Sequence, residues 1–232
     1  MRFLSVVFLL LSAPVLAETV VFEPGLGDGR ESFQAIADRL SVPVFLNQRP
    51  RRMPTDNDGL RTGNETADYL YSQLQAAGAK PPYYLVAHSI GSMTALSFAA
   101  AHPNETGGIL LVDGRMPNFK QRCELDGARP CKIPSAMMML MGRAQKAEIR
   151  GFDATNWPDP RTLGTIPLWM LISNQNPMGV SANYRDAWQN AAVEFSAPYA
   201  QTRLTFVEAD HYIHHARPEL VLGQIQELMA TQ

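Results

Sequence analysis

The sequence has no marked excess of either charge and no apolar run long enough to cross a membrane as a stable helix. Its 20 Lys and Arg residues stand against 22 Asp and Glu, which gives a formal net charge of −2. Without a basic surplus, nucleic acid is not expected as a partner. The composition, 46% hydrophobic and 18% charged, is typical of a soluble globular protein, and 232 residues suit one α/β domain with an insertion.

Signals for a bound metal or cofactor are also missing. No group of His, Cys, Asp and Glu has the spacing of a metal site, so we expect no metal. In the glycine-rich turn at 25–29, Arg30 interrupts the pattern that a dinucleotide site needs, and the strand predicted next ends in Asn47 and Gln48 instead of an acidic residue. We therefore expect no dinucleotide and no other cofactor.

The first seventeen residues have the pattern of a secretory signal peptide. Arg2 is followed by an apolar run over 3–11, and Val15, Leu16 and Ala17 resemble a small-residue cleavage site. We predict cleavage after Ala17 and a periplasmic or secreted mature chain, 18–232, without a stable membrane span. An N-terminal membrane anchor is the alternative, whereas a lipoprotein is not expected because no cysteine follows the apolar run.

Cysteine is scarce, with only Cys123 and Cys131 in the chain. In an oxidising compartment, a close pair around an Asp-Gly turn is most simply a structural disulfide. Closing so short a loop stabilises a fold by roughly 2–3 kcal/mol. Metal binding or redox chemistry would need more ligands or a C-x-x-C spacing, and neither is present.

Apolar runs and helical periods alternate along the mature chain, which favours a mostly parallel sheet flanked by helices. Strands are predicted at 19–23, 42–46, 107–112, 166–173 and 203–207, and a further one begins at Tyr83. Helices are predicted at 31–40, 64–77 and 183–195. Two more helices are predicted, one from the turn after the Tyr83 strand to about 101 and one that begins at Pro218. The pattern changes over about 114–165, where we predict a small cap insertion at the carboxyl edge of the sheet. Met137–Met141 and Trp157 in it either line an acyl pocket or, as we favour, pack the cap on the body.

The stretch from Tyr83 to Leu96 reads as a strand, a tight turn and a helix, with Ser89 at the turn. A nucleophile elbow has this layout and needs small residues two positions before and after the serine. Ala87 and Gly91 meet that need, although the usual pattern has glycine at the first position. The alternative is an ordinary turn whose serine caps the helix.

A serine hydroxyl needs a base to take its proton and N–H donors for the oxyanion. His211 follows the last predicted strand and is the expected base. His88 is expected to point away from that base and to pack beside the elbow, and His102 to be structural. Arg49, Arg51 and Arg52 lie in a polar segment that we interpret as a solvated loop, with an anion-binding role as the alternative.

Several segments together resemble the α/β-hydrolase superfamily, in its branch with a Ser-His-acid triad. They are 21–28, 61–63, 82–91, 111–113 and 210–213. The resemblance implies an α/β-hydrolase fold, Ser89 as nucleophile and His211 as base. It also implies that the backbone N–H groups of Leu26 and Ile90 form the oxyanion hole.

The third triad member departs from the usual pattern of this superfamily. The family usually places an acid in the loop after the strand before last, and Asn176 occupies that place. A minority takes its acid from the end of an earlier strand, where Asp113 stands, and we predict Asp113. The alternative is that Asp113 only caps its strand, and Asp210 is too close to His211 along the chain to orient it.

These residues together predict an exported serine hydrolase that cleaves a small-molecule carboxylic ester through an acyl-enzyme. A serine nucleophile argues against the relatives that use a carboxylate, such as epoxide hydrolases and dehalogenases. An amidase, a peptidase or an acyltransferase could use the same triad, and a non-catalytic binding protein could keep the fold. The sequence predicts neither the acyl-chain length nor the oligomeric state.

Overall fold

The computed structural model describes residues 18–50 and 59–231, so the predicted signal peptide, Arg51 and Arg52 lie outside the described residues. The described part is built on a six-stranded sheet with the strand order β2-β1-β3-β4-β5-β6, in which every pairing is parallel. In chain order the strands are β1 (Thr19–Glu23), β2 (Val44–Leu46), β3 (Tyr83–His88), β4 (Thr106–Val112), β5 (Leu168–Ser173) and β6 (Thr202–Val207).

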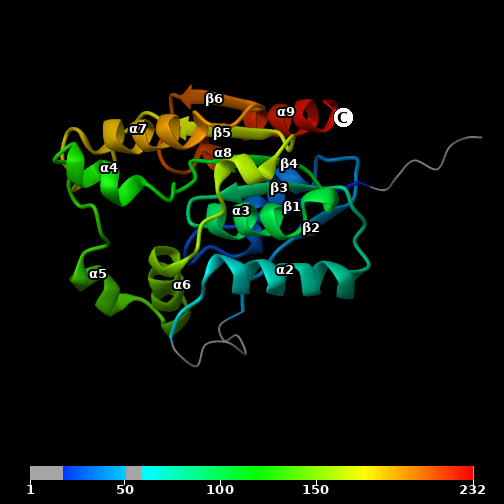
Figure 1. Cartoon of the computed structure of the whole chain (residues 1–232), viewed down its shortest axis with the longest axis horizontal. Coiled ribbons are helices and arrows are strands. Elements are labelled where there is room, and N and C mark those ends of the chain that lie inside the picture. Colours follow the sequence, from blue (N-terminus) through cyan, green and yellow to red (C-terminus); the bar gives the residue numbers. More distant parts are fainter. Residues whose placement is uncertain (1–17, 51–58, 232) are drawn as a thin grey trace, which may run out of the picture.

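Helices cover both faces of this sheet (Figure 1). They are α1 (Gln34–Ala37), α2 (Gly63–Ala77), α3 (Gly91–Ala101), α4 (Phe119–Leu125), α5 (Ser135–Leu140), α6 (Arg143–Ala154), α7 (Tyr184–Ser196), α8 (Ile213–Ala216) and α9 (Pro218–Met229), with short 3-10 turns at Arg30–Phe33, Pro103–Glu105 and Pro160–Leu163. In Figure 1 the arrows of β3 and β6 point toward the side where α4 and α5 project, and because every pairing is parallel, the carboxyl ends of all the strands meet there.

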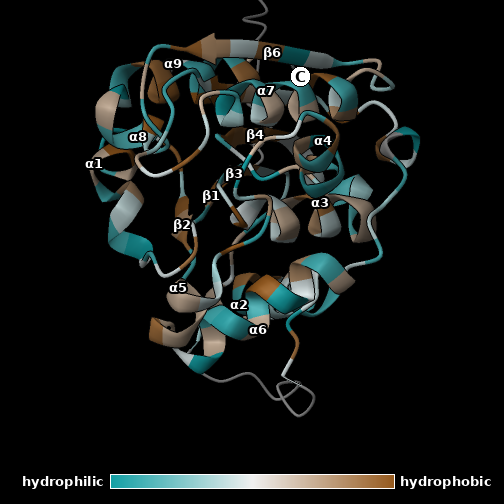
Figure 2. Cartoon of the chain, turned by 90° about the vertical axis from the view of Figure 1, so that its left-hand side faces the viewer, coloured by the Kyte–Doolittle hydropathy of each residue, from teal (hydrophilic) through white to brown (hydrophobic). Residues whose placement is uncertain are grey.

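The central strands are buried on both faces, as the continuous apolar runs predict. Successive side chains alternate between two core clusters: Leu85 and Leu111 pack on the side of α2, α3 and α7, and Val86 and Val112 on the side of α1 and α9. Figure 2 shows the two helical layers on either side of the sheet. The register sets Ala87 beside both Glu23 and Leu111, so the ends of β1, β3 and β4 lie level.

Two predicted elements differ from the structure. The helix expected over 31–40 is a 3-10 turn followed by the short α1, and the loop expected through His215 contains α8. Helix α8 is held against the first of these segments, because the His214 ring stacks on Phe33 with centroids 4.5 Å apart. Each short helix thus depends on the other for its packing.

The segment between β4 and β5 is not a uniform cap. Helix α4 buries Phe119 and Cys123 in the main core, and α6 packs Ile149 and Phe152 beside Ile90 of the elbow. Helix α5 buries no side chain, and its Met139 and Leu140 are 80% and 90% exposed. The prediction that Met137–Met141 packs on the body therefore holds for Met138 and Met141, which pack on the cluster of Ile90, and fails for the other three, because a helix this short leaves only one side near other residues.

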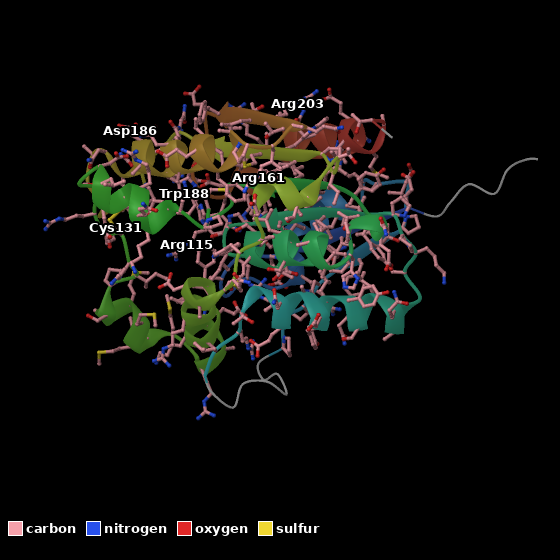
Figure 3. All side chains as sticks on the ribbon, in the orientation of Figure 1. Arg115, Cys131, Arg161, Asp186, Trp188 and Arg203 are labelled. Atoms are coloured by element: carbon pink, nitrogen blue, oxygen red, sulfur yellow. A yellow bond between two sulfur atoms is a disulfide. The ribbon has the colours of Figure 1, made fainter. Side chains whose placement is uncertain are left out.

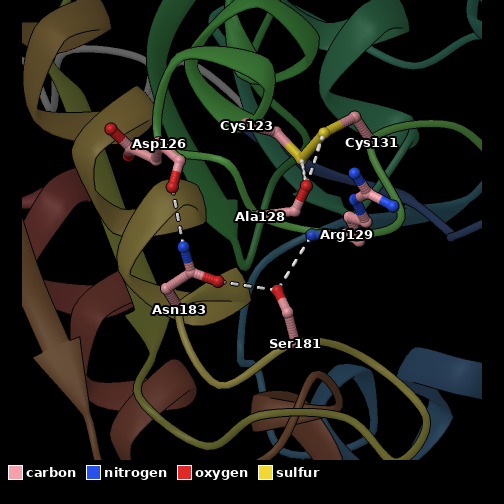
Figure 4. Close-up of a disulfide and its surroundings, with 7 residues drawn as sticks. All are labelled: Cys123, Asp126, Ala128, Arg129, Cys131, Ser181 and Asn183. Atoms are coloured by element: carbon pink, nitrogen blue, oxygen red, sulfur yellow. Dashed lines mark hydrogen bonds between the residues drawn. A yellow bond between two sulfur atoms is a disulfide. The ribbon is translucent and has the colours of Figure 1, made fainter.

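Cys123 and Cys131 form the predicted disulfide, with Cα atoms 5.5 Å apart (Figure 4). The Ala128 carbonyl oxygen inside the closed loop lies 3.1 Å from the Cys131 sulfur. The loop is also tied to the segment before α7, since the Arg129 N–H donates to Ser181 Oγ at 2.8 Å and Asn183 Nδ2 donates to the Asp126 carbonyl at 2.7 Å. The disulfide loop therefore fixes α4 against the start of α7.

Within the described ranges, none of the helices combines the length and apolar character that a membrane-spanning segment requires.

Candidate active site

The turn after β3 presents Ser89 at the carboxyl edge of the sheet. Ser89 has φ 53°, in the left-handed region that non-glycine residues rarely adopt, as expected of a strained elbow. A Cβ at Gly91 would lie 2.7 Å from the Glu23 carbonyl oxygen, so only glycine fits between α3 and β1. Ala87 is fully buried within the sheet, and its methyl group is accommodated there.

Three side chains from three strand ends form one chain of hydrogen bonds. Ser89 Oγ lies 2.9 Å from His211 Nε2, and His211 Nδ1 lies 2.6 Å from Asp113 Oδ2. Asp113 follows β4 directly and has φ 45°. The structure thus brings together the three residues that the sequence predicts as nucleophile, base and acid.

Asp113 is completely buried, and several donors compensate its charge. Its carboxylate accepts the Ser173 N–H at 2.9 Å, Ser173 Oγ–H at 3.0 Å and the Arg185 guanidinium at 3.0 Å. Burial opposes ionisation of this carboxyl, but the hydrogen bond and charge of His211, with Arg185 and the Ser173 N–H, hold its pKa below the usual value. An ionised carboxylate therefore lies behind His211.

The two other residues considered for the third position of the triad, Asn176 and Asp210, have different partners. Asn176 donates from Nδ2 to the Ala182 carbonyl at 2.6 Å, and its Oδ1 accepts the Arg185 N–H at 2.8 Å. Asp210 accepts the Tyr212 N–H at 2.8 Å. Asn176 therefore shapes the entry to α7, and Asp210 shapes the loop that carries His211.

The predicted oxyanion donors lie beside the nucleophile. Leu26 and Ile90 line the same pocket as Ser89. Within residues 18–50 and 59–231, neither of their backbone N–H groups donates a hydrogen bond to another protein group. Both donors are thus available to an oxygen atom that arrives at Ser89.

Arg49 belongs to a buried ionic network and is not a solvated loop residue, which corrects the sequence interpretation. Its guanidinium pairs with Glu23 at the end of β1 and with Glu148 of α6, at 3.1 Å from the latter. It also donates to the carbonyls of Pro24 and Gly25 at 2.6 and 2.5 Å. Arg49 therefore holds the loop that carries Leu26, and its donors are too fully engaged for it to bind an external anion.

His88 also departs from expectation, because it contacts the base loop and does not point away from it. Its Nε2–H donates to the His211 carbonyl at 3.0 Å, and Nδ1 lies 3.4 Å from Asp28 Oδ2. Burial lowers the pKa of His88, although Asp28 opposes the shift. His88 thus connects the loop of Asp28 to the loop of His211. His102, by contrast, stacks on Tyr71 with centroids 3.9 Å apart, away from the site.

A pocket of about 390 Å³ opens at Ser89 and His211. Its walls are mainly apolar and come from the elbow, the disulfide loop, α5 and α7, including Ile133, Met137 and Trp188. Figure 3 shows Arg115, Cys131 and Trp188 on the side of the molecule where α4–α6 lie. Among the described residues, no group of three or more His, Cys, Asp or Glu side chains is arranged to hold a metal ion.

The fold and the family comparisons agree. Residues 18–121 match the thioesterase domain family. The type II thioesterase BorB from the borrelidin biosynthetic cluster superposes with a TM-score of 0.64 at 20% identity, over 95% of this chain and 94% of that one. A thermophilic esterase from Thermogutta terrifontis gives a TM-score of 0.62 at 16% identity, over 92% and 89%.

The chain has the α/β-hydrolase fold, since both structures superpose over nearly its whole length. The fold predicted from the sequence is thereby confirmed. The chain is also similar to the uncharacterized protein YqjL of Bacillus subtilis (strain 168). The two are 26% identical over 214 residues, which cover 88% of this chain and 80% of YqjL.

Proposed function

We propose that this α/β-hydrolase is an exported serine hydrolase that cleaves carboxylic esters through an acyl-enzyme on Ser89. The observation that carries the proposal is the unbroken hydrogen-bonded chain from Ser89 through His211 to the buried Asp113. It ends at the mouth of an apolar pocket, where an acyl group can lie. This combination supplies a base, an orienting acid and a binding surface at one point.

In the first half-reaction, His211 Nε2 takes the proton of Ser89 as Oγ attacks the ester carbonyl. The carboxylate of Asp113 accepts from His211 Nδ1–H, which fixes the tautomer with a free Nε2 and stabilises the imidazolium that forms. His211 then passes the proton to the departing alcohol oxygen, which leaves the acyl group on Ser89.

In the second half-reaction, water takes the place of the alcohol. His211 removes a proton from the water as its oxygen attacks the acyl-enzyme, and the proton returns to Ser89 as the acid departs. The negative charge of both tetrahedral intermediates falls beside the N–H groups of Leu26 and Ile90. Arg49 supports this step indirectly, because it binds the carbonyls of Pro24 and Gly25, and the Gly25 carbonyl shares its peptide group with the Leu26 N–H.

A fluorophosphonate probe tests the mechanism on the purified chain. The probe forms a covalent bond to an activated serine, so we expect a mass increase of one adduct that maps to Ser89 and is absent from Ser89→Ala. A folded wild-type protein that acquires no adduct would instead support the non-catalytic binding protein.

A thioester is the second candidate substrate, because residues 18–121 match the thioesterase domain family. Matched oxygen esters and thioesters of one acyl group decide between the two, since only the leaving atom differs. We expect the larger kcat/KM for the oxygen ester. A larger value for the thioester would make this chain a thioesterase, and turnover of the matched amide would indicate an amidase or peptidase. Transfer of the acyl group to an added alcohol in preference to water would indicate an acyltransferase.

The proposed export rests on the sequence pattern of residues 1–17. Fractionation of cells that express the full chain tests it, with N-terminal sequencing of the recovered protein. We expect a periplasmic or secreted species that begins at Glu18. A membrane fraction whose protein keeps residue 1 would support the anchor alternative.

A further inference from the structure

Arg115 lies beside the nucleophile, although no step of the proposed mechanism uses it. Its backbone N–H donates to the Ser89 carbonyl at 2.9 Å, and its own carbonyl accepts from Ser92 Oγ at 2.6 Å. The residue is therefore anchored to the elbow by its main chain, and its side chain lines the pocket that also contains Ser89.

The guanidinium of Arg115 is buried among aromatic rings with little polar compensation. Its carbon lies 4.5 Å from the centroid of Phe152 and 6.0 Å from that of Phe119, and the side chain is 12% exposed. The ion-pair partner is Asp153, 3.8 Å away and 46% exposed. Among the described residues the guanidinium makes no hydrogen bond, and its Nε is buried without an acceptor.

Such an environment is costly for a cation. A buried charged group normally has hydrogen-bond partners, because burial without them forfeits solvation that the aromatic faces replace only in part. Burial accordingly lowers the pKa of Arg115, against the opposing effect of Asp153. A five-donor group left in this state is arranged to receive an acceptor that the protein itself does not supply.

The charges around the pocket have one sign. Three cationic side chains line it, those of Arg115, Lys132 and Arg185, and among the described residues no Asp or Glu does. Arg185 is occupied by Asp113 and by the Gln175 carbonyl, and Lys132 is exposed at the rim. Arg115 is thus the cation that is both inside the pocket and without a hydrogen-bonded partner.

We propose that the substrate carries a second, anionic group, a carboxylate or a phosphate, which the Arg115 guanidinium binds inside the pocket while Ser89 attacks the ester. Carboxylates and phosphates match the planar fork of arginine, which donates two parallel hydrogen bonds to them. The apolar walls contact the carbon chain between the ester and this group. The proposal rests on the proposed function, and it narrows the substrates to esters with an oxyanion at the far end.

Three nitrophenyl esters of equal chain length test the proposal, with the acyl chain ending in a methyl, a carboxylate or a phosphonate group. For the wild-type protein we expect kcat/KM to be about 10- to 100-fold higher for one of the charged esters than for the methyl ester, as charged hydrogen bonds typically provide. The charged ester with the higher kcat/KM shows whether the pocket binds a carboxylate or a phosphate-like group. Equal values for all three would overturn the proposal.

Arg115→Met removes the charge and keeps an unbranched chain. We expect it to lose the preference for the charged ester, mainly through a higher KM for that ester, and to change the hydrolysis of the methyl ester much less. Arg115→Lys is expected to recover part of the preference, because it restores the charge without the fork. An equal loss on all three esters would show a merely structural role and overturn the proposal.

Arg203→Met is the matched control. Arg203 also stacks on an aromatic ring, 3.8 Å from the centroid of Trp169, but it lies on β6 away from the pocket (Figure 3). Its removal is expected to leave the preference among the three esters unchanged. A loss of the preference in this variant equal to that in Arg115→Met would overturn the assignment to Arg115.

A binding measurement separates this proposal from the proposed function. Calorimetry on Ser89→Ala with glutarate, butylphosphonate and pentan-1-ol is expected to show binding of an anion that Arg115→Met weakens about 10-fold or more. Arg115-dependent binding without turnover or probe labelling would refute the hydrolase and keep the anion site. Binding of neither anion, with normal ester turnover, would refute the anion site alone.

Discussion

Two buried carboxylates at strand ends, those of Glu23 and Asp113, lie on either side of Ser89, and of these two Asp113 alone contacts the proposed base. Glu23 ends β1 and Asp113 follows β4, and each meets an arginine from a distant segment, Arg49 or Arg185. Arg185 leaves Asp113 Oδ2 close to His211, whereas both oxygens of Glu23 are taken, one by Arg49 and one by Asn47.

The two carboxyls consequently differ in their proton affinity. Burial raises the pKa of Glu23 in spite of Arg49, while the donors around Asp113 overcome the same effect and lower its pKa. The network of Asp113 ends in an imidazole that is 29% exposed, and that of Glu23 ends on backbone carbonyls. A buried carboxylate paired with an arginine can thus orient a proton-transferring histidine or hold a loop in place. Which of the two it does depends on whether the pair contacts an imidazole or backbone carbonyls.

The largest effect is expected when Asp113 loses its charge. Asp113→Asn should lower kcat by about 10³- to 10⁴-fold, because an amide does not fix the productive tautomer of His211 or balance its charge. Hydrolysis rates on the purified, folded variant measure this. Asp210→Asn is the control, since within the described part of the chain its side chain bonds a backbone N–H alone, and it should keep nearly full activity. An Asp113→Asn variant within tenfold of wild type would remove the distinction drawn between the two carboxylates.

Breaking the ionic network of Glu23 should lower the stability of the fold. Arg49→Met leaves Glu23 buried without its cation and Glu148 with Arg61 in place of two arginines, and we expect the free energy of unfolding to fall by about 3–5 kcal/mol. Urea denaturation followed by circular dichroism measures this change. Arg39→Met removes an exposed pair with Glu219 and should cause no measurable loss. Equal losses in the two variants would contradict a structural role for the buried network.

His214, three residues after the proposed base, is a buried histidine whose ring does not contact a carboxylate among the described residues, and its pKa should make stability depend on pH. His214 is 2% exposed, and burial, together with the neighbouring histidines, lowers its pKa to about 2. The unfolded chain binds this proton near pH 6.5 while the folded chain does not, so acid favours unfolding. Below pH 6 the stability should fall by about 1.4 kcal/mol per pH unit from this group.

His214→Gln should remove that part of the slope and keep an acceptor for the Ser32 hydroxyl, now 2.9 Å from His214 Nε2. The difference in unfolding free energy between wild type and variant, measured from pH 6 to 4, isolates the contribution. A difference that does not change with pH would show that His214 is protonated in the folded chain.

The smallest effect is expected at Asn176, which occupies the usual place of the acid. Asn176→Ala removes two hydrogen bonds to the segment before α7, which should cost about 1–2 kcal/mol of stability. Its kcat should stay within about twofold of wild type, because the side chain does not bond His211. A loss of kcat comparable to that of Asp113→Asn would assign the orienting role to Asn176.

The strands, the elbow and the histidine after the last strand were predictable because their signals are local. The apolar run of β3 and the small residues around Ser89 lie within a few residues of that serine, and His211 lies a few residues after the end of β6. Asp113 could be proposed because parallel strands end at one edge, so a residue that follows β4 lies near one that follows β3. Its positive φ and its four donors were not visible in the sequence.

The residues that hold the site together could not be predicted in the same way. Arg49 reaches Glu148 across 99 residues, and Arg185 reaches Asp113 across 72, and no periodicity connects such partners. Arg49 lies in a polar stretch that resembles a solvated loop, so the charged Glu23 at the end of a buried strand was the one available hint. His88 was misjudged because its side chain meets a carbonyl from the far end of the chain.

The sparse packing of α5 has a consequence for how this protein can diversify. Its six residues include Met137 in the pocket wall, yet none of them is buried. Helix α6 has no such freedom, because a Cβ at Gly151 would lie 1.8 Å from the Arg61 carbonyl oxygen. Exchange of Ser135–Leu140 is thus a route by which selection or protein engineering can change substrate range while the folding of the hydrolase body stays intact.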